Sequence, residues 1–124
     1  MSKLVNNVDY GKFLDGVLGF DDKIRFVAIY DGQLKAKFQK RIHDDFKEGE
    51  IKASLSEALK IRNQSKKMNF YNFQPKFAMT HYGKINQITI PLENDEVVLV
   101  TTEMDVEIHK IVGKIIEYRN LFSQ

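Results

Sequence analysis

The chain has 124 residues, a mass of 14.4 kDa and a formal net charge of +2. This length predicts one domain, residues 1–124, large enough to bury a core without crosslinks. Hydrophobic residues make up 43% and charged residues 29%, which excludes a disordered or collagen-like chain. The absence of cysteine excludes disulfides, thiol catalysis and cysteine-ligated metals. Because the sequence shows neither a membrane-length apolar run nor a signal peptide, we expect a cytoplasmic protein.

The first part of the chain predicts a helix followed by a hairpin. Apolar residues at helical spacing predict a helix over residues 4–18, ended by Gly19 in the left-handed conformation. Two β-forming runs within residues 24–39 flank Asp31 and Gly32, a pair typical of a two-residue type I′ turn. The first run is apolar almost throughout, which predicts a strand covered on both faces. The second run alternates apolar residues with lysine, which predicts a half-exposed edge strand protected by lysine.

The second part predicts a helix, three strands and a last helix. Residues 51–66 place their apolar side chains on one helical stripe. Strands are expected over residues 76–82, 85–92 and 97–102, and a final helix runs from about residue 105 to 122. The expected fold class is therefore α+β, a five-stranded antiparallel sheet in the order α-β-β-α-β-β-β-α. The middle helix would cover one face and the two terminal helices the other, because each apolar stripe needs a face to bury.

This element order, the opening strand IRFVAIYDG and the hairpin ITIPLENDEVVLVTTE resemble the roadblock/longin group of profilin-like domains. The resemblance covers residues 4–122 and is closest to short roadblock-type chains of archaea. It implies a non-enzymatic, regulatory or adaptor domain. Roadblock domains generally dimerise through the middle helix and the strand after it, and many bind small GTPases or other signalling proteins. Fold analogy alone is a weak guide to function, so these implications are expectations.

The resemblance places a homodimer interface on residues 51–66 and 76–82. Two copies of the middle helix would cross, and two copies of the following strand would pair edge to edge around a two-fold axis. Unpaired, that strand would expose an apolar edge, which is an association hazard. The residues expected at the interface are Ser54, Ala58, Ile61, Phe77 and Met79.

A search for catalytic and ligand-binding patterns yields none. The three histidines are His43, His81 and His109, and no two are spaced as a metal-binding pair on a helix. Serines with a neighbouring base, a nucleophile elbow and a phosphate-binding glycine loop are also missing from the pattern. We therefore expect no enzyme activity, no catalytic residue, no metal and no cofactor.

Charge is unevenly distributed along the chain and leaves two alternatives open. No acidic residue lies between Glu57 and Glu93, whereas six lysines and arginines do. Segment 60–84 could bind single-stranded nucleic acid through lysines and stacking rings, although a pI of about 8.7 is below the strongly basic range. A PAS-like or profilin-like module could instead hold a small molecule between the middle helix and the sheet, with residues 68–75 as a lid. The contacts for either alternative would be Lys66, Lys67, Phe70, Tyr71 and Phe73.

Overall fold

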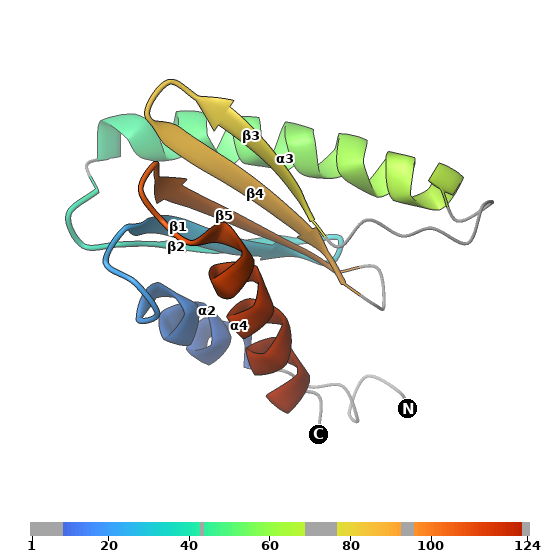
Figure 1. Ribbon diagram of the computed structural model, residues 1–124, viewed down its shortest axis with the longest axis horizontal. Coiled ribbons are helices and arrows are strands. Elements are labelled where there is room, and N and C mark those ends of the chain that lie inside the picture. The colour runs from blue at the N-terminus through green and yellow to red at the C-terminus, as the bar shows by residue number, and fades with distance from the viewer. Residues whose placement is uncertain (1–8, 43, 69–76, 93–95, 123–124) are drawn as a thin grey trace.

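The computed structural model describes residues 9–42, 44–68, 77–92 and 96–122. A five-stranded sheet lies between the long helix α3 on one face and the shorter helices α2 and α4 on the other (Figure 1). In chain order the elements are α2 (Tyr10–Leu18), β1 (Ile24–Tyr30), β2 (Leu34–Phe38), α3 (Asp44–Met68), β3 (Ala78–Tyr82), β4 (Ile85–Pro91), β5 (Val97–Glu103) and α4 (Ile108–Leu121).

The strands lie in the order β2-β1-β5-β4-β3, and every neighbouring pair is antiparallel. The last strand in sequence, β5, therefore lies at the centre, and the two hairpins β1–β2 and β3–β4 lie on either side of it. This confirms the expected α+β class, the element order and the distribution of helices over the two faces. It also makes β2 and β3 the two edges of the sheet.

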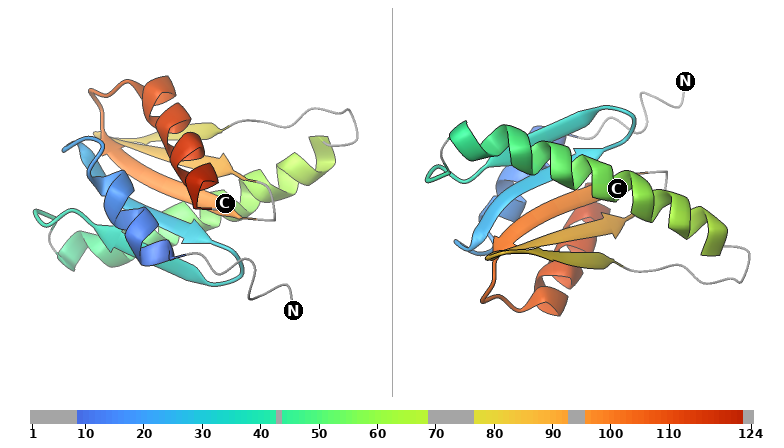
Figure 2. Two further views of the ribbon diagram at one scale, coloured as in Figure 1. Left: turned by 90° about the horizontal axis from the view of Figure 1, so that it is seen from below. Right: turned by 90° about the horizontal axis from the view of Figure 1, so that it is seen from above.

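The larger core lies between the sheet and the helices α2 and α4. Along each central strand, alternate side chains point to this face, as the two-residue period of a strand requires. The fully buried side chains here come from α2, α4 and three strands, and include Phe13, Leu14, Val17, Ile24, Val27, Ile29, Ile88, Ile90, Val98, Val100 and Ile115. Figure 2 shows α2 and α4 side by side over this face.

The contact between the sheet and α3 is smaller and more polar. Its apolar cluster contains Phe26, Ala28, Ala58, Val97 and Leu99. A bulge in β1 between Ile24 and Phe26 places Arg25 against this helix, where its Nη2 donates to Glu50 Oε1 over 2.9 Å. Glu50 Oε2 also accepts a hydrogen bond from Thr101 over 2.8 Å. Helix α3 is thus attached to the sheet by polar bonds as well as by apolar packing.

The β1–β2 turn differs from the predicted two-residue turn. Tyr30 pairs with Leu34, so three residues form the loop. Asp31 accounts for the extra residue, because its Oδ1 accepts a hydrogen bond from the Gln33 N–H over 3.1 Å and its own N–H donates to the Gln33 carbonyl. The expected positive φ is confirmed at Gly32, where φ is 110°.

Three helix ends also differ from prediction. Gly19 is right-handed, with φ −79°, because its N–H still bonds to carbonyls of the last turn of α2. Helix α3 begins at Asp44 and not near residue 51, because its polar first turns carry no apolar stripe that would reveal a helix in the sequence. Helix α4 begins at Ile108 with Glu107 as its N-cap, and Asp105, near which the helix was expected to begin, instead pairs with Lys23 over 3.2 Å.

Candidate protein interface

Strand β3 is the edge of the sheet that carries the predicted interface. It pairs with β4 through five residue pairs, from Ala78 opposite Thr89 to Tyr82 opposite Ile85. The two-residue loop Gly83-Lys84 joins the strands, with Gly83 at φ 57°. On its other side β3 has no strand neighbour among the described residues.

The short loop determines which backbone groups of β3 face outward. The residues that close a two-residue hairpin form a hydrogen-bonded pair, and bonded and non-bonded pairs alternate from there. Tyr82, Thr80 and Ala78 therefore bond to β4. Met79 and His81 direct their N–H and C=O groups away from β4, toward the open edge. This row of unpaired groups is a template for one more antiparallel strand.

The side chains of β3 do not protect this edge. The strand reads Ala-Met-Thr-His-Tyr and contains no lysine, acid or proline, which are the residues that normally block pairing at an edge. The Met79 side chain is 39% exposed. On α3, Leu59 is 40% exposed. Large apolar side chains are thus accessible both on the open strand and on the helix above the sheet, whose C-terminal turns extend past the strands (Figure 1).

The structure places three of the predicted interface residues under α3 and not on its outer surface. Ser54, Ala58 and Ile61 are 0%, 1% and 8% exposed in the single chain, and Ala58 belongs to the apolar cluster between α3 and the sheet. These residues fix the distance between α3 and the sheet. A second copy would meet the outward-facing residues of the helix, and Leu59 is a large apolar residue among those the structure describes.

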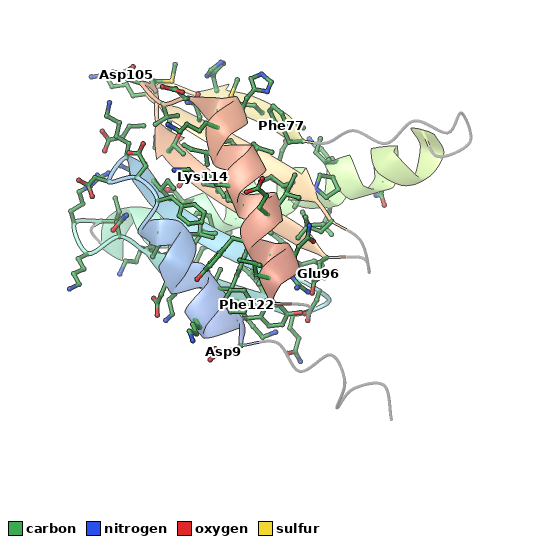
Figure 3. The ribbon with its side chains drawn as sticks, turned by 60° about the horizontal axis from the view of Figure 1, so that its bottom comes forward. Asp9, Phe77, Glu96, Asp105, Lys114 and Phe122 are labelled. Atoms are coloured by element: carbon green, nitrogen blue, oxygen red, sulfur yellow. The ribbon has the colours of Figure 1, made fainter. Side chains whose placement is uncertain are left out.

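The other two predicted interface residues, Phe77 and Met79, differ in how far their side chains are buried. Phe77, directly before β3, packs against the larger core and meets the His109 ring edge to face at a centroid distance of 5.4 Å; Figure 3 shows it beside the first turns of α4. Met79 stays exposed. Of the five predicted residues, Met79 is therefore the one whose side chain is available to a partner.

The side chains proposed for the two alternative functions lie outside the part of the chain that the structure describes. Phe70, Tyr71 and Phe73 lie outside the described residues, as do the side chains of Lys66 and Lys67 in the last turn of α3. The proposed lid, residues 68–75, lies outside them as well except for Met68.

A pocket of about 310 Å³ lies at the start of α4, not between α3 and the sheet. It is lined by Phe20, Val106 and Ile111, by three lysines and by three acids. Two of these charges, Lys23 and Asp105, already form an ion pair. Since cations and anions are equal in number around the pocket, it offers no net attraction to a charged ligand.

A buried ion pair, not foreseen from the sequence, joins the two terminal helices. Arg119 of α4 donates from Nε and Nη2 to the two carboxylate oxygens of Glu96, each over 2.8 Å, and both side chains are 7% exposed. Tyr10 of α2 donates its hydroxyl to Glu96 Oε2 over 2.5 Å. Burial, together with this hydrogen bond, raises the pKa of Tyr10 well above its ordinary value. The carboxylate bonds raise the pKa of Arg119.

The position of this cluster explains why sequence patterns do not reveal it. Glu96 comes from the turn before β5, and its partners are 86 and 23 residues away in sequence. Figure 3 places Glu96 near Phe122, at the C-terminal end of α4, with Asp105 near the opposite end. The cluster fixes α2 and α4 to the sheet at one end of the larger core. No feature of the described residues indicates that it takes part in chemistry.

Within residues 9–42, 44–68, 77–92 and 96–122, no group of three or more histidine, cysteine or acidic side chains is arranged to hold a metal ion. The same residues contain no helix with the length and apolar character needed to cross a membrane.

Solved structures share this fold at very low sequence identity. A Roadblock/LC7 domain from Streptomyces avermitilis superimposes with a TM-score of 0.66 at 6% identity, covering 89% of this chain and 91% of that one. MglB from Myxococcus xanthus gives 0.61 at 11% identity, covering 96% and 91%. MglC from the same organism gives 0.59 at 10% identity, covering 92% of each chain. No family model and no curated protein matches the sequence. The fold is therefore of the Roadblock/LC7 type, and the predicted closeness to archaeal chains stays a prediction.

Proposed function

We propose that this chain is a single, non-enzymatic regulatory or adaptor domain of the cytoplasm that forms a homodimer through β3 and α3 and binds another protein. The observation that carries the proposal is the open β3 edge, with its outward Met79 and His81 backbone groups and no charged side chain. An exposed, uncharged edge strand is rarely left without a partner.

A second copy of the chain fits this edge because antiparallel pairing is self-complementary. Two β3 strands related by a two-fold axis offer each other the same donors and acceptors, so one patch serves both subunits. The sheet would continue from one subunit into the other, and the Met79 side chains would be removed from water. The fold shared with Roadblock/LC7 domains and the sequence resemblance to that group support this arrangement.

The first experiment measures the absolute mass by light scattering behind size exclusion, over a wide concentration range and at low and high salt. We expect twice the chain mass of 14.4 kDa with little dependence on salt, because an interface of backbone bonds and apolar side chains is not screened by ions. A monomer at every concentration would contradict the dimer.

The variant Met79→Lys tests the position of the interface. A lysine on the open edge has to lose its water on pairing, so we expect a monomer. The matched control is Leu121→Lys, which adds the same charge at a side chain that is 64% exposed near the end of α4. A monomer for the first variant and a dimer for the second place the interface on β3; the reverse result excludes it.

Binding to another protein is tested separately. The resemblance implies small GTPases, so a panel of purified small GTPases, each in its GDP-bound and GTP-analogue-bound form, would be passed over the immobilised chain. We expect at least one saturable interaction that distinguishes the two nucleotide states. Equal or absent binding across the panel would remove GTPases from the proposal and leave other signalling proteins as partners.

A further inference from the structure

His81 lies on the open edge at the centre of the proposed interface. Its backbone groups point outward, as those of Met79 do, and its side chain is exposed. By the alternation of a strand, the side chains of Phe77, Met79 and His81 lie on the same face, the one covered by α4. His81 is the one histidine of β3, and imidazole is the side chain type whose charge responds most readily to physiological changes of pH.

The described strands that surround His81, β3 and β4, carry no carboxylate to stabilise its protonated form. Its cross-strand neighbour is Asn86, and β4 contains no titratable side chain. The elements that adjoin β3 and β4 carry Lys84 in the loop, Glu103, Asp105 and Glu107 in β5 and the β5–α4 connection, and His109 and Lys110 in α4. Among those acids, Asp105 pairs with Lys23. Within the described part of the chain, His81 takes part in no ion pair or hydrogen bond through its side chain.

In the two registers that place the two-fold axis at Met79 or at Thr80, pairing of two β3 strands would place His81 against an apolar residue. If the two-fold axis passes through Met79, His81 lies opposite Phe77 of the second copy. If it passes through Thr80, His81 lies opposite Met79 of the second copy. In both registers the opposed residues form a hydrogen-bonded pair, with Cα atoms roughly 5.5 Å apart. Each dimer therefore takes two imidazoles out of water beside a phenyl ring or a thioether.

We propose that His81 makes the self-association of this protein sensitive to pH. The inference rests on the proposed function, because it requires a second copy on the β3 edge. Protonation is disfavoured where the imidazole is desolvated without a counter-charge, so the dimer takes up fewer protons than two monomers do. By linkage, association is strongest above neutral pH and weakens as the pH falls.

The dimer dissociation constant of the full chain tests this proposal, measured by sedimentation equilibrium at several pH values. Because two histidines act together, we expect it to increase on the order of 100-fold between about pH 8 and pH 5. Circular dichroism at each pH restricts the comparison to conditions in which the chain is folded. The variant His81→Gln should dimerise equally well at both ends of the range.

The matched control replaces the other two histidines, His43→Gln and His109→Gln, and should keep the pH dependence of the unmodified chain. If the unmodified chain dimerises equally at all pH values, or if His81→Gln keeps the dependence, the role of His81 is wrong while the dimer stands. If the unmodified chain is a monomer at every pH, the proposed homodimer is wrong. The pH dependence proposed for His81 is then wrong as well. The two failures are therefore distinguishable.

Discussion

The two edges of the sheet differ in how they are protected. On β2, Lys37 forms an ion pair with Asp15 of α2 over 2.9 Å, and Lys35 lies over the ring of Tyr10 at 4.7 Å. Strand β3 carries no charge and exposes Met79. One edge is thus tied by lysines to a helix of its own chain, whereas the other is left open.

This difference indicates a division of roles within the molecule. Substitutions on the β2 edge and where α2 and α4 pack against the sheet should change the stability of the single chain. Substitutions on the β3 edge should change its assembly and leave its stability almost unaltered. The following changes test this division, in order of decreasing effect on the free energy of unfolding.

The largest effect is expected for Arg119→Met. It leaves the buried carboxylate of Glu96 without its bidentate partner, and breaking a buried pair in this way costs about 3–5 kcal/mol. Urea unfolding followed by circular dichroism would measure the loss. The double variant Arg119→Met with Glu96→Leu should recover most of the stability, because it removes the isolated charge; no recovery would contradict this explanation.

Gly16→Ala should be next, because α2 and α4 approach each other closely at this glycine. An added Cβ would lie 2.1 Å from the Tyr118 hydroxyl oxygen and 2.4 Å from its ring. The ring cannot move freely, since it packs against Phe13, Phe20 and Phe122. We expect a loss of about 1–3 kcal/mol from overpacking, although alanine is the better helix former. Gly113→Ala on α4, where nothing obstructs a Cβ, is the control and should be neutral or stabilising.

Tyr10→Phe should cost about 1–2 kcal/mol, because it removes one hydrogen bond to a buried carboxylate. The pKa of Tyr10 is raised in the folded chain, so the stabilisation it provides is fully present below the ordinary tyrosine range and is lost as the pH rises beyond it. The variant should therefore lose less stability than the unmodified chain above about pH 10. Thermal unfolding at neutral and alkaline pH measures both effects, and identical alkaline losses would contradict this role.

Lys37→Ala should cost only about 0.2–1 kcal/mol, because its pair with Asp15 is exposed. The effect on assembly is more informative. The combined variant Lys35→Thr with Lys37→Thr would remove both lysines from the β2 edge and should form species larger than a dimer in light scattering. An unchanged mass distribution would show that α2, and not the lysines, closes this edge.

The sequence patterns predict the sheet well, because its strands are short apolar or alternating runs bounded by turn residues. They also predict that β2 is an edge strand, since the alternation of Lys35 and Lys37 with apolar residues is local. They fail where the determinant is not local. The register of the β1–β2 hairpin depends on which residues pair, so the pattern Asp31-Gly32 did not distinguish a two-residue from a three-residue loop. The first turns of α3 are polar and carry no periodic signal.

The candidate interface shows the same limit. The resemblance directs attention to residues 51–66 and 76–82, but it does not specify which way each side chain points. Ser54 and Ala58 are small and were expected where two helices approach each other; they lie instead where α3 approaches its own sheet. The orientation of a helix about its axis depends on tertiary packing, and the apolar stripe expected in α3 does not determine it, because Ala58 and Ile61 are buried whereas Leu59 is exposed.

The smallest effect on stability is expected for Met79→Lys, the variant with the largest expected effect on assembly. Its side chain is already 39% exposed and its backbone groups do not bond to β4, so the single chain should change by less than about 0.5 kcal/mol. The measurement is urea unfolding at a concentration low enough for the unmodified chain to be monomeric, because a dimer would itself add apparent stability. We expect the variant and the unmodified chain to have equal unfolding midpoints at this low concentration, and the variant to have half the mass of the unmodified chain at high concentration. This result would mean that Met79 acts in assembly and not in the folding of the single chain. A lower midpoint for the variant would mean that Met79 supports the sheet of its own chain, and the contrast between the two edges would then fail.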